Sequence, residues 1–282
     1  GGGGSAGGGS AGGGRAGGGS AGGGQPDGGR TDGGTSDGGG GGSAKFCEVF
    51  ETYATGALSG GATLGPWKVN VADSNGTVSI DGTHVVSGSK ALKVHINNGA
   101  SSGGQLRTKA SPLFSPARPQ LYGRFMMYLA NGAGTSQHWT MFGAAGTVPD
   151  GPTMGHHATY LYSAFASSAK NSYGEVYYDD QTAQDCWHTS NTLMPLDKWT
   201  CVAFSVDGPN KAYRFWLDGT SIPGLSVNTT GDGCVAHPAA TPWYGPNFDE
   251  FYIGALSFHP MTASLDLWID DVVLDTSPVA CP

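Results

Sequence analysis

Short runs of alternating apolar and polar residues, separated by Gly, Asn, Asp and Pro, extend over residues 45–282. Alternation with a period of two is typical of β-strands, and helical periodicity is almost absent. Asp218–Gly219 predicts a tight hairpin turn, because glycine accepts a positive φ at no steric cost. The pattern therefore predicts an all-β jelly-roll sandwich of two antiparallel sheets. The strands that we expect include 76–81, 91–96, 103–110, 121–130, 137–144, 158–165, 175–180, 199–208, 212–219, 251–256 and 267–274.

Residues 1–44 differ sharply from the rest, because half of the 50 glycines lie there in a Gly/Ser-rich cycle. Such a segment has almost no apolar surface to offset the entropy of ordering it. We expect a disordered linker over 1–44, either natural or engineered, and a β-jelly-roll carbohydrate-active domain over 45–282.

The chain is acidic, with 14 Lys and Arg against 22 Asp and Glu. This balance argues against nucleic acid as a partner, which would need a basic excess. No apolar run is long enough to cross a bilayer, and no signal peptide is evident. We therefore expect a mature, exported chain that is extracellular or at the cell surface and monomeric. A lipid anchor upstream of Gly1 would be its sole attachment to a membrane.

The five cysteines show no spacing suited to zinc. In an exported chain they indicate disulfides with one thiol left over. We expect the pairs Cys186–Cys234 and Cys201–Cys281, which leave Cys47 free. Cys47–Cys281 is the alternative pairing.

Polar side chains share one face of several expected strands, since alternate residues point the same way. Arginine, histidine and tyrosine together predict the floor of a groove for a polar, anionic ligand. The competing interpretation is an ordinary solvated sheet face. The residues of this expected floor are Gln105, Arg107, Tyr122, Arg124, His138 and Tyr177.

Several motifs occur in an order that resembles a known family. They are FETYATG, GTVSIDGTHVVSGSKALKV, YGRFMMYL, HWTMF, WTCVAF, RFWLDGTSIPGLSV and LWIDDVVLDTSPVACP. Together they resemble the cellulose-induced secreted proteins of fungi and their bacterial relatives. The concanavalin-like jelly roll of that family is similar to glucuronan and alginate lyases. The resemblance covers nearly all of 46–282 and none of the linker.

The resemblance implies a structural calcium ion that joins the first and last strands. Its ligands would be Glu51, backbone carbonyls of Ser87 and Lys90, and an aspartate of the pair Asp270 and Asp271. Calcium takes six to eight oxygen ligands and mixes carboxylates with carbonyls.

The resemblance also implies β-elimination on a uronate polysaccharide. His138 would be the base, because its pKa lies near the working pH. Tyr177 or Tyr122 would be the acid. Arg124, Arg107 and Gln105 would neutralise the uronate carboxylate, which stabilises the enolate-like transition state.

Three other functions compete with a lyase. A retaining glycosidase needs two nearby carboxylates on one strand, and no E-x-D-x-E run occurs. A non-catalytic carbohydrate-binding module would use Trp187, Trp243 and Tyr244 as stacking platforms. A tethered adhesion protein is the third alternative, because a fold does not fix a function.

Overall fold

The computed structural model describes residues 46–71, 75–99, 101, 103–130, 137–151, 154–167, 170–179, 186–229 and 243–282. For 137–138, 158–167, 170–179, 186–189 and 223 it describes the backbone alone. The linker expected over 1–44 lies outside these residues and stays a prediction. In the part of the chain that is described, no helix is long and apolar enough to span a membrane.

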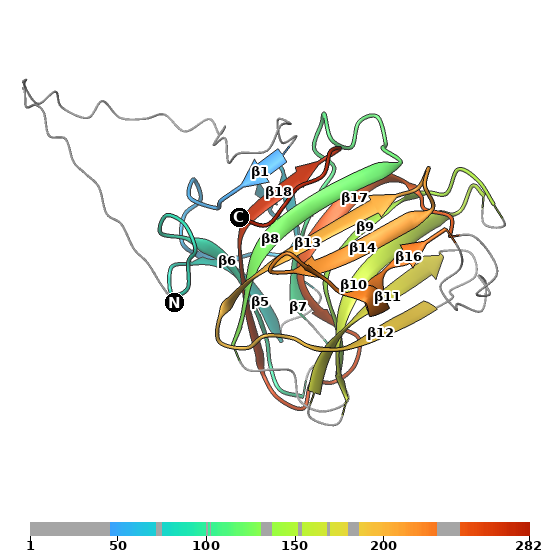
Figure 1. Cartoon of the computed structure of the whole chain (residues 1–282). Coiled ribbons are helices and arrows are strands. Elements are labelled where there is room, and N and C mark those ends of the chain that lie inside the picture. Colours follow the sequence, from blue (N-terminus) through green and yellow to red (C-terminus); the bar gives the residue numbers. More distant parts are fainter. Residues whose placement is uncertain are drawn as a thin grey trace, which may run out of the picture. The chain divides into compact units, whose positions relative to one another are not determined.

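The described residues form the predicted all-β sandwich, with two antiparallel sheets (Figure 1). The ten-stranded sheet has the order β15-β14-β13-β8-β18-β6-β5-β2, with β1 paired to β18 and β16 paired to β14. Its strands are β1 (Phe46–Glu48), β2 (Gly56–Leu58), β5 (Gly76–Asp81), β6 (Ala91–Ile96), β8 (Gln120–Ala130), β13 (Trp199–Asp207), β14 (Ala212–Leu217), β15 (Thr220–Ser221), β16 (Val227–Asn228) and β18 (Leu265–Asp275).

The eight-stranded sheet has the order β12-β11-β10-β9-β17-β7-β4-β3. A short 3-10 helix, η1 (Pro223–Leu225), precedes β16. The strands of this sheet are β3 (Thr63–Leu64), β4 (Trp67–Val71), β7 (Gly103–Thr108), β9 (Gln137–Thr147), β10 (His157–Ser167), β11 (Lys170–Asp179), β12 (Cys186–Leu193) and β17 (Asn247–Ser257).

Aromatic side chains from the two sheets meet in the core. Phe204 of β13 lies with its ring centroid 4.7 Å from that of Phe142 on β9 and 5.8 Å from that of Phe251 on β17. All three are essentially buried. Ring pairs at these separations add to the free energy of burial and hold the sheets at a fixed spacing.

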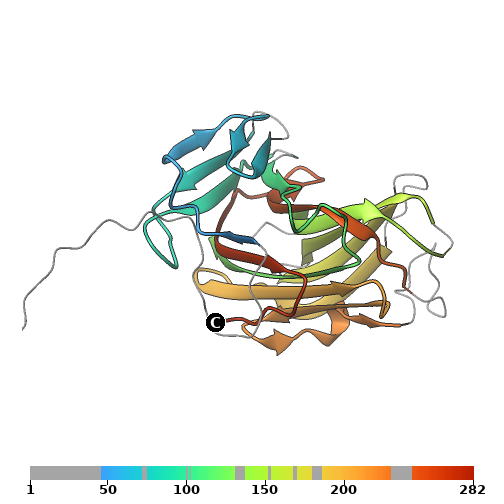
Figure 2. The ribbon, with the colours of Figure 1, turned by 90° about the horizontal axis from the view of Figure 1, so that it is seen from above.

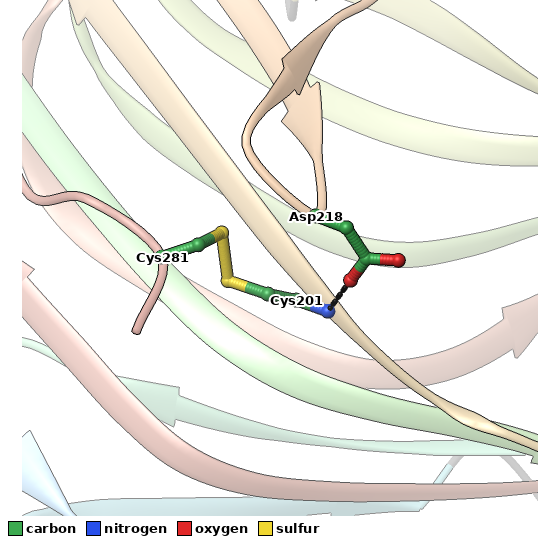
Figure 3. Close-up of a disulfide and its surroundings, with 3 residues drawn as sticks. All are labelled: Cys201, Asp218 and Cys281. Atoms are coloured by element: carbon green, nitrogen blue, oxygen red, sulfur yellow. Dashed lines mark hydrogen bonds between the residues drawn. A yellow bond between two sulfur atoms is a disulfide. The ribbon is translucent and has the colours of Figure 1, made fainter. Parts of the chain in front are cut away.

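The C-terminal segment after β18 is attached to the ten-stranded sheet by a disulfide. Cys281 is bonded to Cys201 of β13, as predicted (Figure 3). In Figure 2 the C-terminus lies beside the orange strands of this sheet. Cys47 is exposed and free, also as predicted, so the alternative pair Cys47–Cys281 is wrong. The expected pair Cys186–Cys234 lies outside the described residues.

The predicted hairpin turn at Asp218 and Gly219 is present between β14 and β15. Both residues have positive φ, 45° and 74°, as a type I′ turn requires. The Asp218 carboxylate accepts a hydrogen bond of 2.8 Å from the Cys201 amide, beside the disulfide (Figure 3). The turn therefore also fixes the strand that carries the disulfide.

Candidate functional site

The structure separates the six residues expected to form one groove floor. Tyr122 and Arg124 lie on β8 of the ten-stranded sheet, and Gln105 and Arg107 lie on β7 of the eight-stranded sheet. Both pairs point away from the core, because their alternating neighbours, such as Leu106, belong to the core cluster. The two pairs thus lie on opposite outer faces, and the prediction of a common floor is wrong.

His138 and Tyr177 belong to the eight-stranded sheet by backbone, in β9 and β11. Only β17 lies between β9 and β7, whereas β17, β9 and β10 lie between β11 and β7. At the usual strand spacing, the backbones of β7 and β11 are roughly 19 Å apart across the sheet. The side chains of His138 and Tyr177 lie outside the described residues, so their predicted roles stay predictions.

Gln105, Arg107 and Tyr252 form a polar cluster on the outer face of the eight-stranded sheet, here called the Arg107 cluster. Tyr252 of β17 is the register partner of Arg107. The Arg107 guanidinium carbon lies 5.2 Å from the centre of the Tyr252 ring, within the range of a cation–π contact. The guanidinium also donates to the Gln105 Oε1 at 3.5 Å.

The Arg107 cluster holds donors that its own residues do not satisfy. Gln105 is 1% exposed, and its Nε2 has no hydrogen-bond partner among the described residues. The Arg107 Nε is buried and equally unpaired within that part of the chain. An unsatisfied buried donor costs about 1–3 kcal/mol, so each is a place where a ligand oxygen gains more than on open surface.

Backbone packing brings β17 unusually close to β7 beside Gln105. Gly254 is the register partner of Gln105 and has a φ of 146°. A Cβ at Gly254 would clash with the Gly104 carbonyl oxygen, so no other residue fits without a shift of the backbone. The glycine therefore allows the backbones of β17 and β7 to pack closely beside Gln105.

Tyr252 is a member of the site that the sequence reasoning missed. It alternates with Phe251 and Ile253, which are both fully buried in the core. The same parity argument that selected Arg107 would have selected Tyr252. Of the stacking platforms suggested for a binding module, Trp243 is 1% exposed and is a core residue instead. Tyr244 is half-buried and carries Lys211 over its ring, and the Trp187 side chain lies outside the described residues.

The residues expected to bind calcium form two hydrogen-bonded groups on the turn 86–90. In the first, the Glu51 carboxylate accepts from the backbone amides of Ser89 and Lys90, both at 2.7 Å. Burial alone would raise the pKa of Glu51, but these hydrogen bonds and the nearby Lys90 charge lower it below its ordinary value. The Lys90 ammonium donates to the carbonyl oxygens of Glu51 and Tyr53, each at 2.8 Å.

The second group joins the turn to β18. Asp270 is fully buried and accepts from the backbone amides of Val86 and Ser87, at 2.9 and 3.2 Å. The Ser87 hydroxyl is hydrogen-bonded to the Asp271 carboxylate at 2.6 Å. Burial raises the pKa of Asp270 to about 6 although the amide hydrogen bonds act in the opposite direction.

This arrangement does not fit the calcium site that the resemblance implies. The carboxylate oxygens of Glu51 and Asp270 face N–H donors of the turn, and the Lys90 ammonium already bridges two carbonyl oxygens. Over the ranges that the structure describes, no group of three or more His, Cys, Asp or Glu could hold a metal ion. We therefore expect no calcium ion at this turn, because the positive charge between the carbonyl oxygens of Glu51 and Tyr53 is that of Lys90.

We expect EDTA to leave the melting temperature unchanged and Lys90→Met to lower the free energy of unfolding by about 1–3 kcal/mol. The ammonium supplies the positive charge between two backbone carbonyls, and its loss leaves both without their donor. Thermal unfolding with and without EDTA measures the first effect, and urea unfolding measures the second. Lys68→Met, at an exposed lysine, is the matched control. A melting temperature that falls with EDTA in the wild type would establish a metal at this turn.

Comparison with known proteins identifies the domain. Residues 58–277 match the polysaccharide lyase-like family described as the Cip1-like core domain. No curated protein sequence matches the chain. Among solved structures, a cellulose-induced protein, Cip1, aligns with a TM-score of 0.56 and 20% identity, over 84% of this chain and 100% of that one. The alginate lyase vAL-1 from a Chlorella virus aligns with a TM-score of 0.52 and 8% identity, over 76% of this chain and 94% of that one.

The two structural matches confirm the jelly-roll fold, and at these identities they show the fold alone. The match to the family covers most of the domain, from β2 to the end of β18. The chain therefore belongs to the Cip1-like family of polysaccharide lyase-like core domains.

Proposed function

We propose that the domain cleaves an acidic polysaccharide by β-elimination at the outer face of the eight-stranded sheet. The observation that carries this proposal is the pair of unpaired, buried donors, Gln105 Nε2 and Arg107 Nε, on one face of β7. Donors of an arginine and of a glutamine amide two residues apart on one strand face suit the two oxygens of a uronate carboxylate. Acidic polysaccharides occur outside the cell, which agrees with the proposed extracellular or cell-surface location of the protein.

The proposed chemistry needs the carboxylate to be neutralised before the neighbouring C5–H bond is broken. Arg107 and Gln105 would bind the carboxylate and stabilise the negative charge that develops on it. A base removes the C5 proton, the electron pair forms the C4–C5 double bond, and the C4–oxygen bond breaks. The leaving oxygen then takes a proton from an acid.

Two residues are proposed for the proton transfers. Tyr252 is the acid, because its ring lies against Arg107 in the same cluster. His138 is the base, because β9 is separated from β7 only by β17, the strand that carries Tyr252. Arg124 and Tyr122 have no role in this proposal, since they lie on the other sheet.

The first test is the ultraviolet absorbance of the unsaturated sugar that β-elimination leaves at the new chain end. We expect absorbance to rise when the purified domain is mixed with glucuronan or alginate, and to stay flat with neutral cellulose. The neutral polymer lacks the carboxylate that Arg107 and Gln105 would bind. Binding of a polyuronate without any unsaturated product would overturn the lyase and leave a binding module.

A further inference from the structure

The outer face of the ten-stranded sheet carries a trough with small side chains along its floor. Ala203 and Ser205 lie on β13, between β8 and β14, and point away from the core. Their register partners on β14 are the larger Trp216 and Arg214. Large side chains on β14 beside small ones on β13 leave a depression on this face.

The C-terminal segment closes the trough into a cavity of about 760 Å³, here called the tail cavity. Its lining includes residues 278–281 together with Tyr122, Ser205, Arg214 and Trp216. The Cys201–Cys281 disulfide holds this segment in place. Pockets for small molecules have volumes of about 300–1,000 Å³, so the space suits a ligand of a few sugar units.

The hydrogen-bonding capacity of the Asp207 carboxylate, which lines the tail cavity, is taken up by neighbouring amide groups. Asp207 accepts from the Gln120 amide at 3.0 Å and from the Asn210 side chain at 2.7 Å. Although burial alone raises the pKa of Asp207, these hydrogen bonds and Arg214 lower it, so the carboxylate stays ionised. Burial and the Asp207 charge raise the pKa of Tyr122, which keeps that phenol a donor toward Asp207.

Arg214 acts on Asp207 through its charge without a direct ion pair. Its side chain is exposed, and no carboxylate of the described residues forms an ion pair with it. Half-buried Trp216 lies on the same face of β14, two residues along. An indole beside an exposed guanidinium offers an apolar surface for the C–H face of a sugar ring and a partner for an acidic group.

We infer that the tail cavity is a second carbohydrate-binding site, which takes a short segment of an acidic polysaccharide on the sheet opposite to the Arg107 cluster. Trp216 stacks on a sugar ring, and Arg214 binds a carboxylate of the same segment. Amide and hydroxyl groups of the lining form hydrogen bonds with the sugar hydroxyls; they include those of Asn210, Asn228 and Ser205. The lone guanidinium suits a single carboxylate better than a polyphosphate, which would need several cations.

The test is calorimetric titration of the full chain carrying Arg107→Ala, with a glucuronan tetrasaccharide as the probe. The substitution removes the guanidinium of the Arg107 cluster. Binding that remains in this variant is therefore attributed to the tail cavity, whether or not the domain is a lyase. We expect one binding site per chain. Adding Trp216→Ala should weaken binding about tenfold, as loss of a stacking partner does. Trp199→Ala is the matched control, because Trp199 is half-buried on the same sheet and is not part of the cavity lining.

Charge recognition is tested with a neutral cellotetraose in the same titration. We expect Arg214→Ala to lower the affinity for the acidic probe about tenfold and the affinity for the neutral probe by less than about twofold. Cys281→Ser releases the wall of the cavity and should weaken both probes, while thermal unfolding checks that the domain remains folded. Absence of binding in the Arg107→Ala chain, or equal affinity with Trp216→Ala, would overturn the site. Equal affinity of the Arg107→Ala chain for both probes would overturn its preference for acidic sugars.

Discussion

Replacing Arg107 by alanine is expected to slow β-elimination by about a hundredfold to a thousandfold, the usual cost of removing one donor that stabilises a developing negative charge. The expectation follows from burial, because the Arg107 Nε lies in the protein without a hydrogen-bond partner among the described residues. The interaction of Arg107 with a carboxylate is therefore more favourable than that of an arginine in water. Initial rates of absorbance increase on glucuronan or alginate measure the loss.

Two matched variants distinguish this role from a general effect of positive charge. Lys109→Ala removes an exposed cation two residues further along the chain and should leave the rate unchanged. Arg124→Ala removes an arginine from the opposite outer face of the sandwich and should also leave it unchanged. If Arg124→Ala abolished the activity and Arg107→Ala did not, the site would belong on the ten-stranded sheet. Arg107→Lys keeps the charge without the paired donors and is expected to recover only part of the rate.

The strands themselves could be predicted because apolar and polar residues alternate along each of them. The expected strand 121–130 corresponds to β8, and 267–274 corresponds to β18, within two residues at each end. Alternation reports whether a side chain points into the core or out of it, and this was correct for Gln105, Arg107, Tyr122 and Arg124. The sequence signal is local, so it reaches no further than the strand that carries it.

Sheet membership could not be predicted in the same way. Whether two outward-facing residues share a surface depends on which strands pair, and pairing is decided by contacts between segments far apart in the chain. β8 pairs with β13 and β18, whereas β7 pairs with β4 and β17. Arg124 and Arg107 therefore look equivalent in sequence and lie on different sheets. The tail cavity depends on a similar long-range feature, because its wall comes from the last residues of the chain.

The N-terminal strand shows a further limit of the sequence signal. Glu48 is a charged residue beside the expected calcium ligand Glu51, and nothing in its neighbourhood predicts burial. In the structure it is 8% exposed, and its carboxylate accepts from the Phe50 amide at 2.8 Å and from the Trp67 Nε1 at 3.0 Å. The Tyr53 hydroxyl donates to it as well, at 2.6 Å. Glu48 thus joins β1 to β4, which belongs to the other sheet.

Glu48→Ala is expected to lower the free energy of unfolding by about 3–5 kcal/mol, because it leaves the Phe50 amide and the Trp67 indole N–H buried without an acceptor. Burial and the Glu48 charge raise the pKa of Tyr53, so its phenol is also a donor that loses its partner. Urea unfolding followed by tryptophan fluorescence measures the loss.

Glu48→Gln keeps one acceptor oxygen but turns an amide N–H₂ toward the remaining donors, so an intermediate loss is expected. Val49→Ala, at the exposed neighbouring position, should change the stability little. A loss below about 1 kcal/mol in Glu48→Ala would mean that water reaches these donors once the carboxylate is removed. The contact between β1 and Trp67 would then depend on packing alone. That packing is the edge-to-face contact of Phe46 with Trp67, whose ring centroids are 5.2 Å apart.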